Sequence, residues 1–303
     1  MSLRNIRGRR AIENIARVYS AQIISLCLSL IMTLYTPKFL GVEQFSYWQL
    51  FLFYASYSGL IQLGMLDGVY LRYGGKELTY NEKSVISGLL KFSALVLGIL
   101  LVCCAFLFPM VMNFNDSEYW VFILLLVYTW VYNISGFCGM TLQAINKFKS
   151  YTSGVILDKV FLIITVLTAG LLAINSYRLI ICLYIIGVAF SAVVYLMGNK
   201  DIFMSKYILT RDILKEVKVN IASGINLMLS NISATLIVGV SRFFVSIKYP
   251  ITTFGIVSFA FTLCGFILFF ISQIGNAIYP LLKQKEMAFH QDIYPKLNHM
   301  LSA

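Results

Sequence analysis

Eight apolar stretches, each close to the length that a lipid bilayer demands, divide this chain. A hydrocarbon core about 30 Å thick is crossed by about 20 helical residues. Because lipid offers the backbone no hydrogen-bond partner, each stretch is expected to be a helix. We predict membrane spans at residues 18–36, 46–66, 85–112, 119–143, 154–174, 179–198, 222–241 and 254–275. The expected fold class is an all-α polytopic membrane protein with about eight transmembrane helices.

Composition and charge agree with this reading. Hydrophobic residues make up 59% of the chain and charged residues 12%, whereas about 25% charged residues is usual in soluble domains. Of the 24 Lys and Arg residues, 18 fall on one side of the predicted membrane, four on the other and two within spans. By the positive-inside rule both termini are expected to be cytoplasmic. The net charge of +11 is spread over short loops, which indicates anionic membrane lipid as a partner and not nucleic acid.

The longest loop, residues 199–221, separates six predicted spans from two. We therefore predict a six-helix lobe at 1–198, a cytoplasmic linker at 199–221, and the start of a second lobe with a cytoplasmic tail at 222–303. Apolar residues recur in the linker at near-helical spacing, at Ile208, Leu209, Ile213, Leu214 and Val217. This pattern is typical of an amphipathic helix. It could lie on the membrane surface, or it could be a solvated connector whose apolar side packs on neighbouring helices.

Charged residues inside the spans are candidate site residues, because a charge at the centre of a membrane helix costs about 2.5–3.5 kcal/mol. Lys91 lies in the third span, and Asp158 and Lys159 lie in the fifth. Lys91 could extend to the headgroups, pair with Asp158, or border a cavity. Asp158 and Lys159 point about 100° apart on a helix, so they cannot both face lipid. At least one of them is expected to face a cavity.

Three arginines at span ends complete the candidate set. Arg17 and Arg72 flank the cytoplasmic ends of the first two predicted helices, where they either orient the helices or border a cavity. Arg242 closes the seventh span on the side that is poor in basic residues, so we expect it to line a translocation path. Cations around a cavity favour an anionic cargo. An exporter of cationic drugs would instead need buried carboxylates, and Asp158 is the only acidic residue well inside a span.

Metal binding and cofactor binding are not expected. All six cysteines fall within predicted spans without ligand spacing, which is typical of small apolar packing residues. The two histidines, His290 and His299, lie nine residues apart in the predicted tail. Outside the membrane, the predicted loop from Pro37 to Phe45 begins where the proline ring ends the first helix, and Gly41 allows it to turn tightly.

Several short motifs resemble one family of transporters. They are the sequence LYTPKFLGVEQFSYW at 34–48, LGMLDG at 63–68, RYG at 72–74, Arg242, the stretch 254–261, and the pair Tyr279–Pro280. With these the chain resembles the oligosaccharide flippases, including Wzx-type O-antigen flippases, within the superfamily that also contains multidrug exporters. Ser46 departs from the family pattern, which more often has Gly there. The family usually has twelve or more spans, so this chain is expected to be truncated and to lack most of a second lobe.

The resemblance implies a flippase of the bacterial plasma membrane and not an enzyme. Such a protein turns polyprenyl-pyrophosphate-linked oligosaccharide repeat units, the precursors of O-antigen, lipopolysaccharide or capsule, from the cytoplasmic to the outer leaflet. Two six-helix lobes would rock about a central cationic cavity by alternating access. The expected partners are the lipid-linked oligosaccharide, anionic membrane lipid and the polysaccharide polymerase machinery.

Three other functions stay open. The nearest is a multidrug or organic-ion exporter on the same fold. A membrane-bound glycosyltransferase or polysaccharide polymerase would need a large loop carrying acid, base or nucleotide-binding residues, and the predicted outer loops are too short to build one. The chain could also be an inactive fragment.

Overall fold

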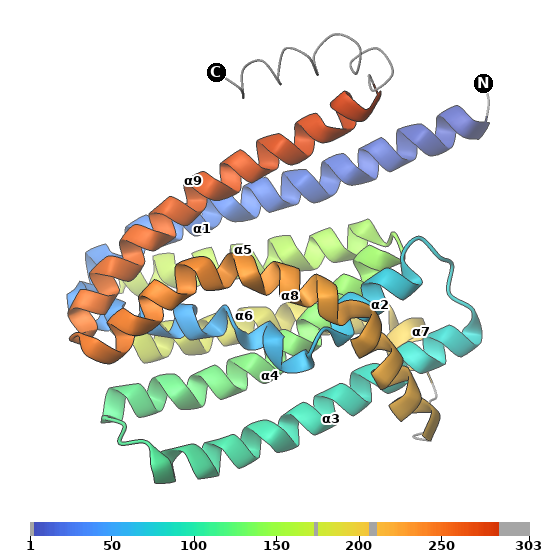
Figure 1. Cartoon of the computed structure of the whole chain (residues 1–303). Coiled ribbons are helices and arrows are strands. Elements are labelled where there is room, and N and C mark those ends of the chain that lie inside the picture. Colours follow the sequence, from blue (N-terminus) through green and yellow to red (C-terminus); the bar gives the residue numbers. More distant parts are fainter. Residues whose placement is uncertain (1–2, 173–174, 206–210, 285–303) are drawn as a thin grey trace, which may run out of the picture. The chain divides into compact units, whose positions relative to one another are not determined.

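The computed structural model describes residues 3–172, 175–205 and 211–284, and every regular element in these ranges is a helix (Figure 1). The helices are α1 (Leu3–Ala55), η1 (Ser58–Gln62, a 3-10 helix), α2 (Met65–Tyr73), α3 (Tyr80–Val111), α4 (Asp116–Ala144), α5 (Phe148–Leu171), α6 (Tyr177–Gly198), α7 (Lys200–Phe203), α8 (Arg211–Lys248) and α9 (Ile251–Gln284). The predicted all-α class is confirmed. His290, His299 and the rest of the predicted tail from residue 285 lie outside the described residues, as do Ile208 and Leu209 of the predicted linker.

Five helical segments among the described residues are long and apolar enough to cross a membrane, or six if the bent helix α8 is counted as one span. The number is lower than the predicted eight. The first two predicted spans fall in a single candidate, Leu26–Gln62, and the start of α9, Ile251–Ile267, is apolar but shorter than the others. The polytopic membrane class holds with this smaller number.

Helix α1 shows why the first two predicted spans merge. Residues 37–45 were expected to form a loop, and this expectation is wrong, because the helix continues through Pro37 and is interrupted only at Gly41. Gly41 has φ 73° and ψ 165°, a backbone conformation that only glycine adopts readily. The chain therefore changes direction at one residue, and two helical stretches meet there without a loop.

A second interruption lies inside the predicted second span, residues 46–66. Helix α1 ends at Ala55, the short helix η1 follows, and Leu63 and Gly64 both take left-handed conformations, with φ values of 52° and 82°. Irregular backbone at membrane depth is tolerated where it is covered by protein or lines a cavity. A cavity is therefore expected beside this break.

Helices α2 and α8 pack closely along one another through glycines. A Cβ atom added at Gly68 would lie 1.9 Å from the carbonyl oxygen of Asn220, and one added at Gly224 would lie 2.1 Å from the carbonyl oxygen of Gly64. Near this crossing Nη1 of Arg72 lies 2.7 Å from Oε2 of Glu216. Only residues without a side chain allow two helices this close an approach.

Residues 211–221 of the predicted linker form the first turns of α8. Ile213 is buried, and Val217 and Ile221 pack against a cluster of buried residues that includes Met65 and Val69 of α2. The apolar side of this segment thus lies against neighbouring helices. The predicted domain boundaries remain predictions. The chain forms two compact units, Met1–Phe259 and Ala260–Ala303.

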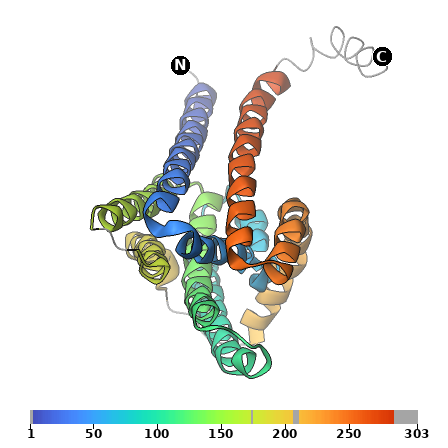
Figure 2. The ribbon, with the colours of Figure 1, turned by 90° about the vertical axis from the view of Figure 1, so that its left-hand side faces the viewer.

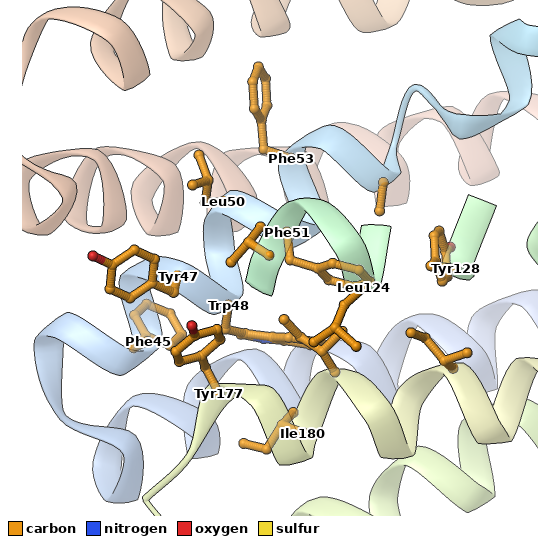
Figure 3. Packing of buried hydrophobic residues seen from close by; sticks show 14 of the residues in the cluster. Phe45, Tyr47, Trp48, Leu50, Phe51, Phe53, Leu124, Tyr128, Tyr177 and Ile180 are labelled. Atoms are coloured by element: carbon orange, nitrogen blue, oxygen red, sulfur yellow. The ribbon is translucent and has the colours of Figure 1, made fainter. Parts of the chain in front are cut away.

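Within the first unit, α5 and α6 lie on one side of the bundle and α8 lies on the other, as the turned view in Figure 2 shows. The second stretch of α1 fills the space between α4 and α6 with aromatic side chains (Figure 3). Phe51 is fully buried, and its ring lies 5.7 Å from Trp48 and 5.2 Å from Tyr128 of α4. Phe53 points to the other side of α1 and packs edge-on against Phe254. These contacts fix the position of the break that follows Ala55.

A small ionic cluster joins the start of α3 and the residue before α5 to the short helix α7. Lys83 lies 3.0 Å from one carboxylate oxygen of Asp201, and Lys147 lies 3.9 Å from the other. The hydrogen bond from Lys83 holds the pKa of Asp201 below its usual value, so the carboxylate stays charged. This cluster gives α7 a fixed place beside the ends of the longer helices.

Candidate functional site: a tyrosine-lined cavity

A cavity of about 490 Å³ lies among the helices of the first unit. Its walls come from the break between α1 and α2, from α4, α5 and α6, and from the middle of α8. The volume is within the range of about 300–1,000 Å³ that is usual for ligand sites. Helices α3 to α6 are otherwise strongly apolar, so polar residues around this space have a reason to be there.

The charged residues of the wall are Asp67, Asp158 and Lys159. Nζ of Lys159 lies 3.1 Å from Oδ2 of Asp158, and the side chains are 20% and 17% exposed. Nζ of Lys159 also lies 5.9 Å from the centre of the Tyr184 ring, a distance at which a cation is attracted to an aromatic face. The lysine is therefore neutralised by its neighbour in the chain and held against a tyrosine.

Six tyrosines line the same space. They are Tyr57, Tyr128, Tyr132, Tyr151, Tyr184 and Tyr195. Three of them form a stack in which the ring of Tyr128 lies 5.4 Å from that of Tyr132 and 5.5 Å from that of Tyr184, with interplanar angles of 24° and 18°. Tyr128 is 4% exposed and Tyr132 is 40% exposed. The stack thus presents Tyr132 to the cavity at one end and meets Lys159 at the other.

Asn133 of α4 supports the break in the chain next to the cavity. Its Nδ2 donates hydrogen bonds to the carbonyl oxygens of Ser58 and Thr129, at 2.9 and 2.7 Å. The hydroxyl groups of Ser58 and Thr129 lie 2.9 Å apart, and Nε2 of Gln62 donates to the carbonyl oxygen of Asn133. The carbonyl oxygen of Ser58, inside the break, thereby finds a partner on α4, as a backbone group must away from water.

Helix α8 is bent by 56° between Ser233 and Thr235, where it passes the cavity. The hydroxyl of Ser233 donates to the carbonyl oxygen of Leu229 at 2.8 Å, a contact that often bends helices. Two of the helices around the cavity are therefore irregular at the level of the site. Discontinuous helices of this kind form the substrate sites of many membrane transporters.

Of the six candidate residues, the structure brings two together at the cavity, Asp158 and Lys159. Lys91 donates to the carbonyl oxygen of Ser205 at 3.3 Å, and Asp158 pairs with Lys159. Arg72 pairs with Glu216 at the crossing of α2 and α8. None of these contacts tests a role in transport.

Arg242 and Arg17 lie elsewhere. Arg242 turns into the protein near the end of α8, where its Nε donates to the hydroxyl of Ser258 at 3.2 Å and its guanidinium lies 4.9 Å from the centre of the Phe53 ring. It does not line the cavity found among the described residues. Arg17 belongs to α1, but its side chain lies outside the described part. The roles of both arginines in a translocation path stay predictions.

The sequence reading missed the tyrosines, Asn133 and Asp67. A tyrosine inside an apolar run does not stand out in the sequence of a membrane helix. Only the fold shows that these six tyrosines converge. A signal for the break was present, because Ser56, Ser58 and Gly59 interrupt an apolar segment before Gly64. Among the described residues no group of three or more His, Cys, Asp or Glu side chains is placed to hold a metal ion.

The long apolar helices define a class, that of multi-pass membrane proteins. The family follows from the sequence, since residues 11–285 match the family described as "Polysaccharide biosynthesis protein". The match covers most of the chain, so the chain belongs to this family, and the suspected resemblance is confirmed. No curated protein and no solved structure matches the chain significantly.

Proposed function

We propose that this protein is a flippase that moves polyprenyl-pyrophosphate-linked oligosaccharide repeat units from the cytoplasmic to the outer leaflet of a bacterial plasma membrane. The observation that carries the proposal is the tyrosine-lined cavity of about 490 Å³ inside a membrane protein of a polysaccharide family. The cargo crosses unchanged, so no bond is broken and no cofactor is required. Precursors of O-antigen, lipopolysaccharide or capsule are cargoes of this class.

Alternating access is the mechanism that suits this arrangement. The break at Leu63 and Gly64 and the bend of α8 after Ser233 lie beside the cavity. Such points absorb changes in backbone angles while the remaining helices move as rigid pieces. We propose that the two irregular segments act as hinges that open the cavity to one side of the membrane and then to the other. The proposed loading side is cytoplasmic, because the proposed cargo moves from the cytoplasmic to the outer leaflet.

A second candidate, an exporter of organic cations, is favoured by one observation. Two carboxylates, Asp67 and Asp158, and six tyrosines line the cavity, and aromatic faces with carboxylates are what an organic cation binds. Asp158 is already paired with Lys159, however, which leaves Asp67 as the carboxylate for such a ligand. The family match to polysaccharide biosynthesis decides our preference for the lipid-linked sugar.

Complementation of a bacterial strain that lacks its own flippase separates these candidates. We expect the chain to restore surface polymer. If the chain has broad specificity, the polymer has the sugar composition of the test strain; if its specificity is narrow, polymer returns only in the strain from which the chain comes. Membrane abundance is measured in parallel by immunoblot. Extrusion of cationic dyes from the same cells, with no polymer in the source strain, would establish the exporter and contradict the flippase.

A further inference from the structure

The cavity walls fit the sugar part of a lipid-linked cargo better than its pyrophosphate. Resting on the function proposed above, we infer that the cavity binds the oligosaccharide and that Tyr132 is the platform on which a sugar ring stacks. The pyrophosphate then lies outside this part of the site.

The aromatic stack provides the first argument. Tyr128 is sandwiched between Tyr132 and Tyr184, so both of its faces are covered within the protein. Tyr132 lines the cavity and is 40% exposed, so part of its side chain is open to a ligand. The face of an aromatic ring carries partial negative charge, and it attracts the polarised C–H groups that cover one face of a sugar ring.

The charges of the wall provide the second argument. Lys159 is the sole cation of the described lining, which also carries two carboxylates: Asp67, and Asp158, which pairs with Lys159 at 3.1 Å. A pyrophosphate in this space would meet Asp67 without a free cation to offset the repulsion, because charges interact strongly where water is excluded. A neutral sugar avoids this cost. The cavity therefore selects against the anionic end of the cargo.

Native mass spectrometry of the purified chain in detergent tests the inference with two probes. One is the lipid-linked oligosaccharide extracted from a flippase-deficient strain, and the other is the same polyprenyl pyrophosphate without sugar. We expect the wild type to bind the glycosylated carrier about tenfold more tightly than the bare carrier, the effect of one good aromatic contact. Tyr132→Ala is expected to remove most of this preference and to leave binding of the bare carrier unchanged, whereas Tyr132→Phe keeps it.

Tyr119 offers a matched control, because it lies on the same helix, is also 40% exposed and lies away from the cavity. Tyr119→Ala should keep the full preference. Equal binding of both carriers by the wild type, or an unchanged preference in a folded Tyr132→Ala variant, would overturn the sugar site while leaving the flippase intact. Failure of the wild type to bind either carrier would count against the proposed function itself. Thermal unfolding of each variant shows whether its fold is retained.

Discussion

Replacing Gly68 with alanine is expected to destabilise the protein by about 2–3 kcal/mol, since overpacking a tight contact costs this much when the neighbour cannot move. The added Cβ would lie 1.9 Å from the backbone carbonyl oxygen of Asn220. No side-chain rotation relieves such a clash, so α2 and α8 must separate. Gly224→Ala should behave alike, because its Cβ would lie 2.1 Å from the carbonyl oxygen of Gly64. Thermal unfolding of the purified protein in detergent measures the loss.

Gly136→Ala is the matched control for these variants. Its added Cβ would lie 3.6 Å from Cδ2 of Leu66, an ordinary van der Waals distance, and a helical glycine replaced by alanine gains helix propensity. We expect it to be as stable as the wild type or slightly more stable. A Gly68→Ala variant that unfolds at the temperature of Gly136→Ala would show that α2 and α8 are not packed as described.

Lys159→Met is expected to cost about 3 kcal/mol of stability, because it leaves the buried carboxylate of Asp158 without its partner. The lysine amine lies 3.1 Å from that carboxylate, and both side chains are mostly buried among tyrosines. Asp158→Asn should cost a similar amount by leaving the lysine alone. The double variant Asp158→Asn/Lys159→Met removes both charges and should recover most of the loss.

A double-mutant cycle on unfolding free energies measures this coupling. If the two single losses simply add in the double variant, the ion pair is not a structural unit and the description of the cavity wall is wrong. Surface polymer measured on the same four proteins gives a second readout. A double variant that is stable but makes no polymer would assign the pair a role in handling cargo beyond that of holding the wall.

The fold class could be predicted from the sequence because one simple quantity, the length of each apolar run, is set by the thickness of the bilayer. The breaks could not be located in this way. The sequence predicts one apolar span at residues 46–66, yet the chain leaves helical geometry at Leu63 and Gly64. The hydropathy of these residues does not indicate that change. Pro37 was expected to end a helix, but the helix continues to Gly41.

Within the candidate site, the sequence predicts only those residues that place a charge inside an apolar helix. Asp158 and Lys159 were found on that signal, and the structure places both at the cavity. Lys91 carries the same signal, whereas Arg242 was singled out because it closes a span on the side poor in basic residues. Their side chains donate hydrogen bonds to Ser205 and Ser258. The tyrosines gave no signal. Five of them converge from α4, α5 and α6, and Tyr57 lies in the break after α1, so their convergence is a property of the packed helices and not of any one segment.

Blocking the cavity tests the central claim most directly. Asn231 lies on α8, lines the cavity and is exposed, so tryptophan can enter there without disturbing a packed core. Ile237→Trp is the control, at a position on the same helix that is 78% exposed and away from the cavity. The measurement is the rate at which proteoliposomes carry lipid-linked oligosaccharide to the opposite leaflet. We predict wild-type rates for Ile237→Trp and loss of transport for Asn231→Trp, and transport at the wild-type rate by folded Asn231→Trp protein would contradict the account.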